Sequence, residues 1–541
     1  MATPTTSHPV QASLSVGGLS TELLVLILET LRDLDTTSVG VARRLSRRFN
    51  AIATPIRYQF LRLNEKIIAP RAAIEFPAGL ANICAYTRQV TIDTTLDVEL
   101  VRAFLDNIQN LSCIRWRCIH DGHPLGHYWK PSVSTRSQHL QIRGVKLHIE
   151  DLPLVDVDAG EPSPYAAIPT DMLESLKVAP PSPPLTARLG SLKGLLLKSS
   201  GLKALQYNDR GQGTHFVFNR DDERMPPFRE LSLRSYNWNH SSAEVRRHWD
   251  FSQIRRLDLI DVPLSRFLDS VSFSDFRNLE RLRLDDYSAH LPARYHQRRE
   301  EVTRKQHSLI KQIRGLVELE LTCHVKLFPI NDEEILSRHG PRLQRLRLRD
   351  YVGFSDEERP CPTLAVEDIA TLSQHLIHLR DLELDADEKT FVSSDFLRAI
   401  CDFPRLRALV LHTQTVVGSS YTNSNKGIGT RETSISNPPP FRLEDGGAAS
   451  SQDVDDVDRK RALYVFASLV RDKRGALASW RSVTVNVGGW KPIMMRRQSA
   501  PWRERNARGI FAERCFVMEK AEDGDGGVPF VVREVMPTLA T

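Results

Sequence analysis

Apolar residues recur along the chain in one short frame, Leu-x-x-Leu-x-Leu. Because side chains alternate between the two faces of a β-strand, the last two apolar positions predict a strand with one buried face. The clearest copies begin at Leu279, Leu316, Leu343, Leu379 and Leu406. Looser copies begin at Thr87, Leu111, Ile142, Leu173, Leu202, Phe228 and Ile254. Successive copies start 24 to 37 residues apart, which predicts an internal repeat.

The segments between these copies have the apolar spacing of short helices. Two helical faces are formed by Leu264, Phe267, Leu268 and Val271 and by Ile369, Leu372 and Leu376. The pair Gly340-Pro341 is a helix stop signal. A strand followed by a helix in each period predicts an α/β fold, in which parallel strands stack into a solenoid over residues 80–415.

This arrangement resembles the leucine-rich repeat family in an irregular form. The family usually has Asn or Cys three places after the last leucine of the frame, whereas Tyr287, Tyr351 and Asp387 stand there in this chain. We therefore expect an uneven coil without the usual asparagine ladder.

Helical spacing also marks the region near the N-terminus. Its apolar residues are Leu19, Leu23, Leu24, Ile27, Leu28 and Leu31. Ser20 stands where an N-cap belongs, with Glu22 in the first turn. A second helix is predicted from Asp35 or Thr36, presenting Val41, Leu45, Phe49 and Ile52 on one side, with Pro55 limiting its extension. Two such short helices cannot form a core alone, so they pack on the rest of the chain, as a cap of the solenoid, or on a partner.

The same stretch resembles the F-box over residues 17–60. The similarity lies in LSTELLVLILETL (19–31), Leu34-Asp35 and LSRRFNAIA (45–53), in that order. The family usually has Pro at the place of Ser20 and Val at the place of Leu45. The resemblance implies that these helices dock into a Skp-type adaptor bound to a cullin scaffold. The implied adaptor-facing residues are Leu19, Leu23, Leu24, Ile27, Leu31, Leu45 and Phe49.

Charged residues occupy the outward positions of four predicted strands, and their sign alternates from strand to strand. We call this set the charged rows; it comprises Arg281, Arg283, Glu318, Glu320, Arg345, Arg347, Arg349, Asp381, Glu383 and Asp385. Two interpretations are open. The charges pair between neighbouring strands, or they form a recognition surface for a protein client. Alternating sign argues against a groove that follows phosphates.

The composition limits the class of protein. The chain has 541 residues, of which 41 % are hydrophobic and 26 % charged, with a net charge of +6, and this is typical of a soluble globular protein. The longest apolar run near the start, 23–28, is bracketed by Glu22 and Glu29, and residues 1–18 contain no Lys or Arg. We expect neither a membrane span nor a secretion signal, and no nucleic-acid partner. Seven cysteines favour a reducing compartment, cytoplasmic or nuclear.

Residues with catalytic or metal-binding chemistry are sparse. The best metal-like cluster is Cys113, Cys118, His120, His123 and His127, but Cys113 lies inside a predicted strand, and a buried thiol beside a polar loop explains the pattern better than a metal site. No motif for a nucleophilic serine, a phosphate-binding loop or a zinc protease is present. We expect no catalysis by this chain, no metal and no cofactor.

The remaining segments complete the predicted domain organisation. Residues 1–16 are predicted to be a disordered tail, and 416–458 a disordered insertion rich in Ser, Asn, Gly, Pro and Asp. Residues 459–541 are expected to contain a helix at 459–472, a last strand at Trp480 and a hairpin at 514–535. A Pro-rich break lies at 180–184. The basic insertion 285–314 is a helix on the outer rim, or a contact for nucleic acid or acidic protein.

Together these patterns favour one function and leave two others open. An F-box joined to leucine-rich repeats resembles proteins abundant in filamentous fungi, and implies a substrate-recognition subunit of an SCF-type (Skp-cullin-F-box) ubiquitin ligase. The first alternative is a repeat scaffold for protein interactions outside any ubiquitin ligase. The second is an RNA-binding solenoid, whose binding would weaken steeply with salt.

Overall fold

The computed structural model divides the chain into two compact units. It describes residues 16–119, 144–154, 165–166, 168–179, 189–209, 211–285, 296–350, 361–414, 441–443, 457–473, 479–488, 514–521 and 529–535. Unit 1 comprises 1–181 and 191–202, and unit 2 comprises 182–190 and 203–541. The division falls at the Pro-rich break, inside the region that the sequence predicts to be one repeat array.

Three helices begin unit 1: α1 (Thr21–Leu34), α2 (Thr36–Ala42) and α3 (Arg47–Tyr58), preceded by the 3-10 turn η1 (Val16–Gly18). Each α-helix has a side-chain N-cap. Ser20 Oγ accepts from Leu23 N, Asp35 accepts from the first turn of α2, and Ser46 Oγ accepts from Phe49 N. The predicted first helix and its Ser20 cap are therefore confirmed.

The predicted single second helix is wrong. Its residues form two helices, because the chain leaves the helical path after Ala42 and Ser46 starts a new helix. Pro55 does not end the second of them, since α3 continues to Tyr58. Proline removes only one N–H from the helix, and packing of α3 against α1 and α2 offsets that loss.

The rest of unit 1 adds a parallel sheet and further helices. The strands are β1 (Phe60–Arg62), β2 (Gln89–Asp93), β3 (Cys113–Arg117), β4 (Lys146–Leu152) and β5 (Leu173–Val178). Each pairs in parallel with the next in chain order. The helices are α4 (Glu65–Ile68), α5 (Ala72–Glu75), α6 (Pro77–Tyr86), α7 (Val98–Leu105) and α8 (Gly190–Lys198).

Unit 2 contains a longer sheet. Its parallel strands are β6 (Ala204–Asn208), β7 (Glu230–Arg234), β8 (Arg256–Ile260), β9 (Arg281–Asp285), β10 (Glu318–Thr322), β11 (Arg345–Arg349), β12 (Asp381–Ala386), β13 (Ala408–Thr413) and β15 (Ser482–Val487). They pair in that order. Two antiparallel strands follow, β16 (Arg514–Lys520) and β17 (Phe530–Val535), and the two-residue β14 (Arg442–Leu443) pairs with β17. These strands lie at the positions where the sequence predicts a last strand and a C-terminal hairpin.

The register follows the repeat frame in unit 2. Leu319 on β10 faces Leu282 on β9 and Leu346 on β11, and all three hold the middle position of the frame. In unit 1, by contrast, Ile114 faces Leu147, which is the last apolar residue of the copy predicted at Ile142. That copy is therefore two residues out of step with the sheet.

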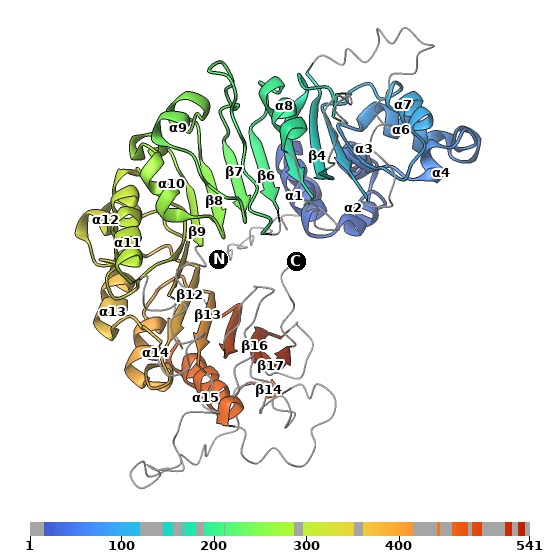
Figure 1. Cartoon of the computed structure of the whole chain (residues 1–541). Coiled ribbons are helices and arrows are strands. Elements are labelled where there is room, and N and C mark those ends of the chain that lie inside the picture. The colour runs from blue at the N-terminus through green and yellow to red at the C-terminus, as the bar shows by residue number, and fades with distance from the viewer. Residues whose placement is uncertain are drawn as a thin grey trace, which may run out of the picture. The chain divides into compact units, whose positions relative to one another are not determined.

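Helices connect the strands of unit 2. They are α9 (Ser242–His248), α10 (Leu264–Ser270), α11 (His296–Gln312), α12 (Glu333–His339), α13 (Val366–His375), α14 (Ser394–Cys401) and α15 (Val457–Asp472), with the 3-10 turns η3 (Phe273–Phe276) and η6 (Thr390–Val392). Within this unit α9 to α14 lie along one face of the strands (Figure 1). The predicted α/β fold class with a mostly parallel sheet is confirmed. Among the described residues, no helix is long and apolar enough to cross a membrane.

Two predicted disordered segments fall mainly outside the described residues. Of the predicted tail 1–16, only Val16 is described, and it begins η1. Within the predicted insertion 416–458, residues 441–443 are described and include β14, and α15 begins at Val457 instead of residue 459. The segment around β14 is thus an exception to that prediction.

Candidate functional site

Helix α1 has two apolar faces, one of which is covered. Leu24 and Leu28 are 0 % and 2 % exposed, and Leu28 packs with Val39 of α2 and Ile56 of α3 in a small core cluster. Because α2 and α3 close over this side of α1, the three helices bury apolar surface among themselves.

The second face of α1 is uncovered within the described structure. Leu23, Leu26, Ile27 and Leu34 are 49 %, 59 %, 47 % and 82 % exposed, and we call these four residues the apolar face of α1. Their spacing of three, four and seven residues places them on one side of the helix. Contiguous exposed leucine and isoleucine side chains on a helix are typical of a surface that a partner covers.

The structure distributes the predicted adaptor-facing residues between these two environments. Leu23, Ile27 and Leu45 are exposed, with Leu45 in the turn between α2 and α3. Leu19, Leu31 and Phe49 are half-buried, and the last two pack against the core cluster. Leu24 is fully buried, which contradicts its assignment to a partner surface. It occupies the inner face because it lies four residues before Leu28.

Sequence reasoning missed two residues of the apolar face. Leu26 and Leu34 have the same helical spacing as Leu23 and Ile27, and both are more exposed than either. The resemblance to a known motif drew attention to Leu24 instead. A helical projection of the sequence places Leu26 and Leu34 beside Leu23 and Ile27, but which face is covered depends on the packing of α2 and α3.

Hydrogen bonds fix the start of α1, where the apolar face begins. Arg48 Nη2 on α3 donates to the carbonyl oxygen of Leu19 at 2.6 Å. Ser20 Oγ accepts from Leu23 N at 3.4 Å. The pKa of Glu22 is lowered because its carboxylate accepts hydrogen bonds from the Glu22 backbone N–H and from the Ser20 side chain. Ser20 therefore performs a capping role at the place where the F-box family usually has proline.

The charged rows lie on β9 to β12, as their spacing predicts, and they pair between strands. Arg281 contacts Glu318 at 3.6 Å, and Arg283 contacts Glu320 at 3.4 Å. Arg345 lies between Glu320 at 3.6 Å and Asp381 at 3.7 Å. These contacts correspond to the first of the two interpretations, in which the charges satisfy each other across the sheet.

Within each strand of the charged rows, the side chains become more buried toward the C-terminal end of the strand. Arg347 donates from Nε to Glu383 Oε1 at 3.0 Å, and Arg349 donates from Nε to Asp385 Oδ1 at 2.6 Å. Burial raises the pKa of Glu383, but Arg347, a hydrogen bond from His412 and Arg349 outweigh it, so the pKa lies well below the usual value. Glu383 therefore stays ionised and paired.

Paired charges in this arrangement offer a partner little unsatisfied potential. Exposed members such as Arg281 and Arg345 are 48 % and 47 % exposed and remain accessible, so a client surface there stays a prediction. The apolar face of α1 is the stronger candidate site.

The basic insertion predicted on the rim is α11, and three of its described cations are paired, whereas Arg304 is exposed without an ion pair in the described structure. Buried Arg299 forms an ion pair with Asp350, and Lys305 contacts Asp269 and Glu301. Lys311 contacts Asp332 at 2.8 Å. Because these three charges are matched locally, they offer a polyanion little attraction.

The metal-like cluster is only partly within the described residues. Cys113 is half-buried on β3 and Cys118 is buried, and desolvation raises the pKa of the Cys118 thiol to about 12. His120, His123 and His127 lie outside the described residues. In the described part of the chain, no three His, Cys, Asp or Glu side chains are grouped as metal ligands.

No protein-family model matches the chain, and a search of the curated proteins found no match.

Proposed function

We propose that this chain is the substrate-recognition subunit of an SCF-type ubiquitin ligase. In this proposal α1 to α3 are an F-box that docks a Skp-type adaptor on a cullin scaffold, and the strand–helix repeats hold a protein client. The observation that supports it most is the apolar face of α1, which stays exposed although the same helix already buries Leu24 and Leu28.

The energetic argument concerns the cost of leaving that face in water. Fully burying a leucine or isoleucine side chain is worth about 1.5–3 kcal/mol. Leu23, Leu26, Ile27 and Leu34 together therefore provide a driving force sufficient for a helix-in-groove interface. A cap of the solenoid has no need of this second face.

The proposed subunit would accelerate ubiquitin transfer without forming a bond itself. A client and a conjugating enzyme that carries ubiquitin, held on one scaffold, react at a raised effective concentration. The residues that matter are then those of two docking surfaces, and such a complex would work in the cytoplasm or the nucleus.

The test is co-purification of the full-length chain with a Skp-type adaptor, using two matched variants. Ile27→Asp places a carboxylate in the apolar face, where Ile27 is 47 % exposed. Ile74→Asp makes the same change on α5, where Ile74 is 84 % exposed in the same unit. We expect the adaptor to co-purify with the native chain and with the Ile74 variant, and to be lost with the Ile27 variant.

Two results would contradict the proposal. If the native chain recovers no adaptor, the alternative of a repeat scaffold outside any ubiquitin ligase is favoured. If the Ile27 variant recovers as much adaptor as the Ile74 variant, the apolar face is not the docking surface.

A further inference from the structure

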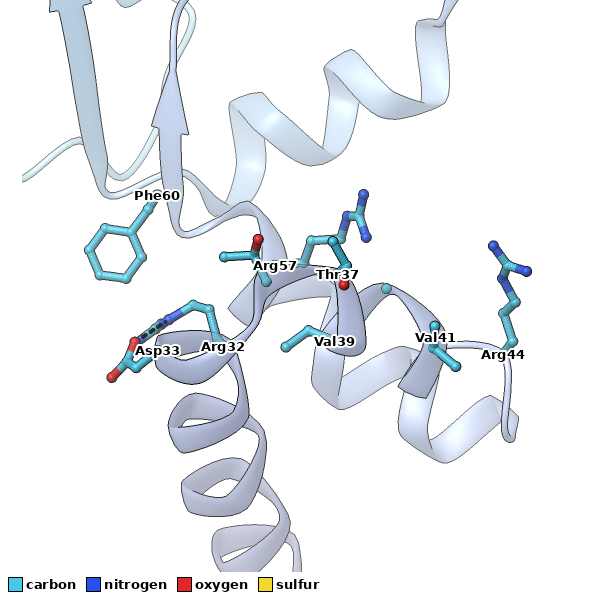
Figure 2. A pocket seen from close by; sticks show the side chains of 10 residues that line it. Arg32, Asp33, Thr37, Val39, Val41, Arg44, Arg57 and Phe60 are labelled. Carbon is cyan, nitrogen blue, oxygen red and sulfur yellow. Dashed lines mark hydrogen bonds and ion pairs between the residues drawn. The ribbon is translucent and has the colours of Figure 1, made fainter. Parts of the chain in front are cut away.

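Unit 1 contains a hollow that the proposed function does not use. Its volume is about 750 Å³, and it lies between the end of α1, helix α2, the end of α3 and the start of β1 (Figure 2). The residues that determine its chemistry are Arg32, Gly40, Val41, Arg44, Arg57 and Phe60. A volume of this size matches sites that enclose a small ligand or a few side chains.

One wall of the hollow is fixed by Arg32. Its guanidinium donates to Asp33 Oδ1 at 2.8 Å and to Gln59 Oε1 at 2.7 Å. It also stacks over the ring of Phe60, 4.5 Å from the centroid. Arg32 is thus a structural part of the wall, and its charge is shared with Asp33.

The other two arginines are unpaired. Within the described part of the chain, the guanidinium groups of Arg44 and Arg57 have neither an ion pair nor a hydrogen-bond partner, and both residues are exposed. In Figure 2 their guanidinium groups extend to the same side of α2. Two unpaired guanidinium groups at one hollow attract carboxylates strongly, because each can donate two parallel hydrogen bonds.

Gly40 places one of these groups. A Cβ atom at Gly40 would lie 2.1 Å from Nη1 of Arg57. The guanidinium can therefore lie against α2 only because residue 40 has no side chain. This gives a means to displace Arg57 without changing any charge.

Exposed apolar groups flank the unpaired arginines. Val41 is 58 % exposed and Phe60 is 47 % exposed, and both line the hollow. The charged lining residues are Arg32, Arg44 and Arg57 against the single carboxylate of Asp33. The hollow therefore combines excess positive charge with an apolar wall.

We infer that the hollow binds an acidic peptide segment that also carries a large apolar side chain, with Arg44 and Arg57 pairing its carboxylates and Val41 and Phe60 contacting the apolar group. A peptide fits better than a nucleic acid, because a polyanion needs a continuous row of cations and the hollow adjoins Asp33 and the N-cap Asp35.

This site is distinct from the apolar face of α1. Arg32 follows Leu23 by nine residues, which is two and a half helical turns, so the two side chains lie on opposite sides of α1. The inference therefore concerns a different side of α1, and the variants below separate its failure from that of the proposed function.

The test measures binding of a fluorescein-labelled peptide of alternating aspartate and phenylalanine to the full-length chain, by fluorescence anisotropy. We expect the double variant R44Q/R57Q to weaken binding by about tenfold or more. Arg47→Gln is the matched control, because Arg47 is also exposed and unpaired in the described structure but does not line the hollow. G40A should weaken binding while leaving the net charge unchanged. Thermal unfolding of each variant checks that unit 1 is intact.

Several outcomes would overturn the inference. These are equal binding by R44Q/R57Q and R47Q, equal binding of a peptide with asparagine in place of aspartate, and tighter binding of single-stranded RNA than of the peptide. Loss of peptide binding in the Ile27→Asp variant would show that the hollow is not separate from the apolar face. Peptide binding by that variant, together with loss in R44Q/R57Q, supports the inference whether or not an adaptor binds α1.

Discussion

Arg349 on β11 donates from Nε to Oδ1 of Asp385 on β12 at 2.6 Å, and the side chains of the pair are only 4 % and 1 % exposed. Asp385 also accepts from the backbone N of Asp350 at 2.7 Å. A charge this deeply buried is stable only while its partners remain.

Removing one partner of that pair should therefore destabilise unit 2. We expect Arg349→Met to lower the free energy of unfolding by about 3 kcal/mol, because the buried Asp385 side chain loses its cationic partner. Arg281→Met is the matched control, since Arg281 and its partner Glu318 are 48 % and 28 % exposed; it should cost under about 1 kcal/mol. Urea unfolding of both variants gives the comparison, and equal losses would contradict the burial argument.

Acid should destabilise the chain through His339. This buried ring accepts from Leu316 N at Nδ1, at 3.1 Å, and Nε2 lies 3.2 Å from the carbonyl oxygen of Ile310. Burial lowers its pKa to about 4. In the unfolded chain a histidine has a pKa of about 6.5, so as the pH falls the unfolded state takes up the proton before the folded state does. The free energy of unfolding is therefore at its full value above about pH 6.5 and falls as the pH drops toward 4. By pH 5 the loss is about 2 kcal/mol.

The unfolding temperature measured between pH 7 and pH 5 tests this relation. His339→Gln should reduce its dependence on pH, whereas His375→Gln, at an exposed position of α13, should leave it unchanged. An unchanged dependence in the His339 variant would show that other groups carry the proton uptake.

Two glycines should respond in opposite ways to alanine. A Cβ atom at Gly340 would lie 2.5 Å from the carbonyl oxygen of Leu336 and 2.8 Å from that of His375, where α12 ends against α13. Gly340→Ala should cost about 1–3 kcal/mol, because neither backbone can move freely. A Cβ atom at Gly194 in α8 meets no atom within 4 Å, so Gly194→Ala should stabilise by about 0.5–1 kcal/mol. Calorimetry on both variants would reveal the difference in sign.

Neighbouring leucines of α1 should separate folding from docking. Leu24→Ala removes a fully buried side chain and should cost about 2–5 kcal/mol. Leu23→Ala, at a position 49 % exposed, should change stability little and weaken recovery of a Skp-type adaptor. A large stability loss in the Leu23 variant would mean that the outer face is covered by the chain itself.

The strand positions could be predicted because they follow from local spacing. The alternation of leucine with charge around Leu282, Leu319 and Leu346 places each strand and the side it buries, and the register repeats that frame. The copy predicted at Ile142 is out of step because Val145 and Leu147 fit the last two positions of the frame as well as Leu147 and Ile149 do. Only the pairing with β3 selects the second alignment.

The parts that could not be predicted depend on contacts between distant residues. The break between α2 and α3 follows from the Ser46 cap and from packing on α1, whereas the apolar spacing also fits one continuous helix. The position of Arg57 over Gly40 joins residues on two different helices, and no local pattern indicates it. The exposure of Leu23 and the burial of Leu24 likewise depend on which side of α1 the other helices cover.

The leucines of the frame are the same in each of these strands, whereas the charge at the outward positions alternates in sign from one strand to the next. Arg283 of β9, Glu320 of β10, Arg347 of β11 and Glu383 of β12 hold the same position in successive strands. Deleting the repeat that contains β10 would place Arg283 beside Arg347, two like charges. Deleting the repeats that contain β10 and β11 together would place Arg283 beside Glu383, two opposite charges. The sheet should therefore tolerate the deletion of two neighbouring repeats better than the deletion of one, because only an even number keeps opposite charges side by side.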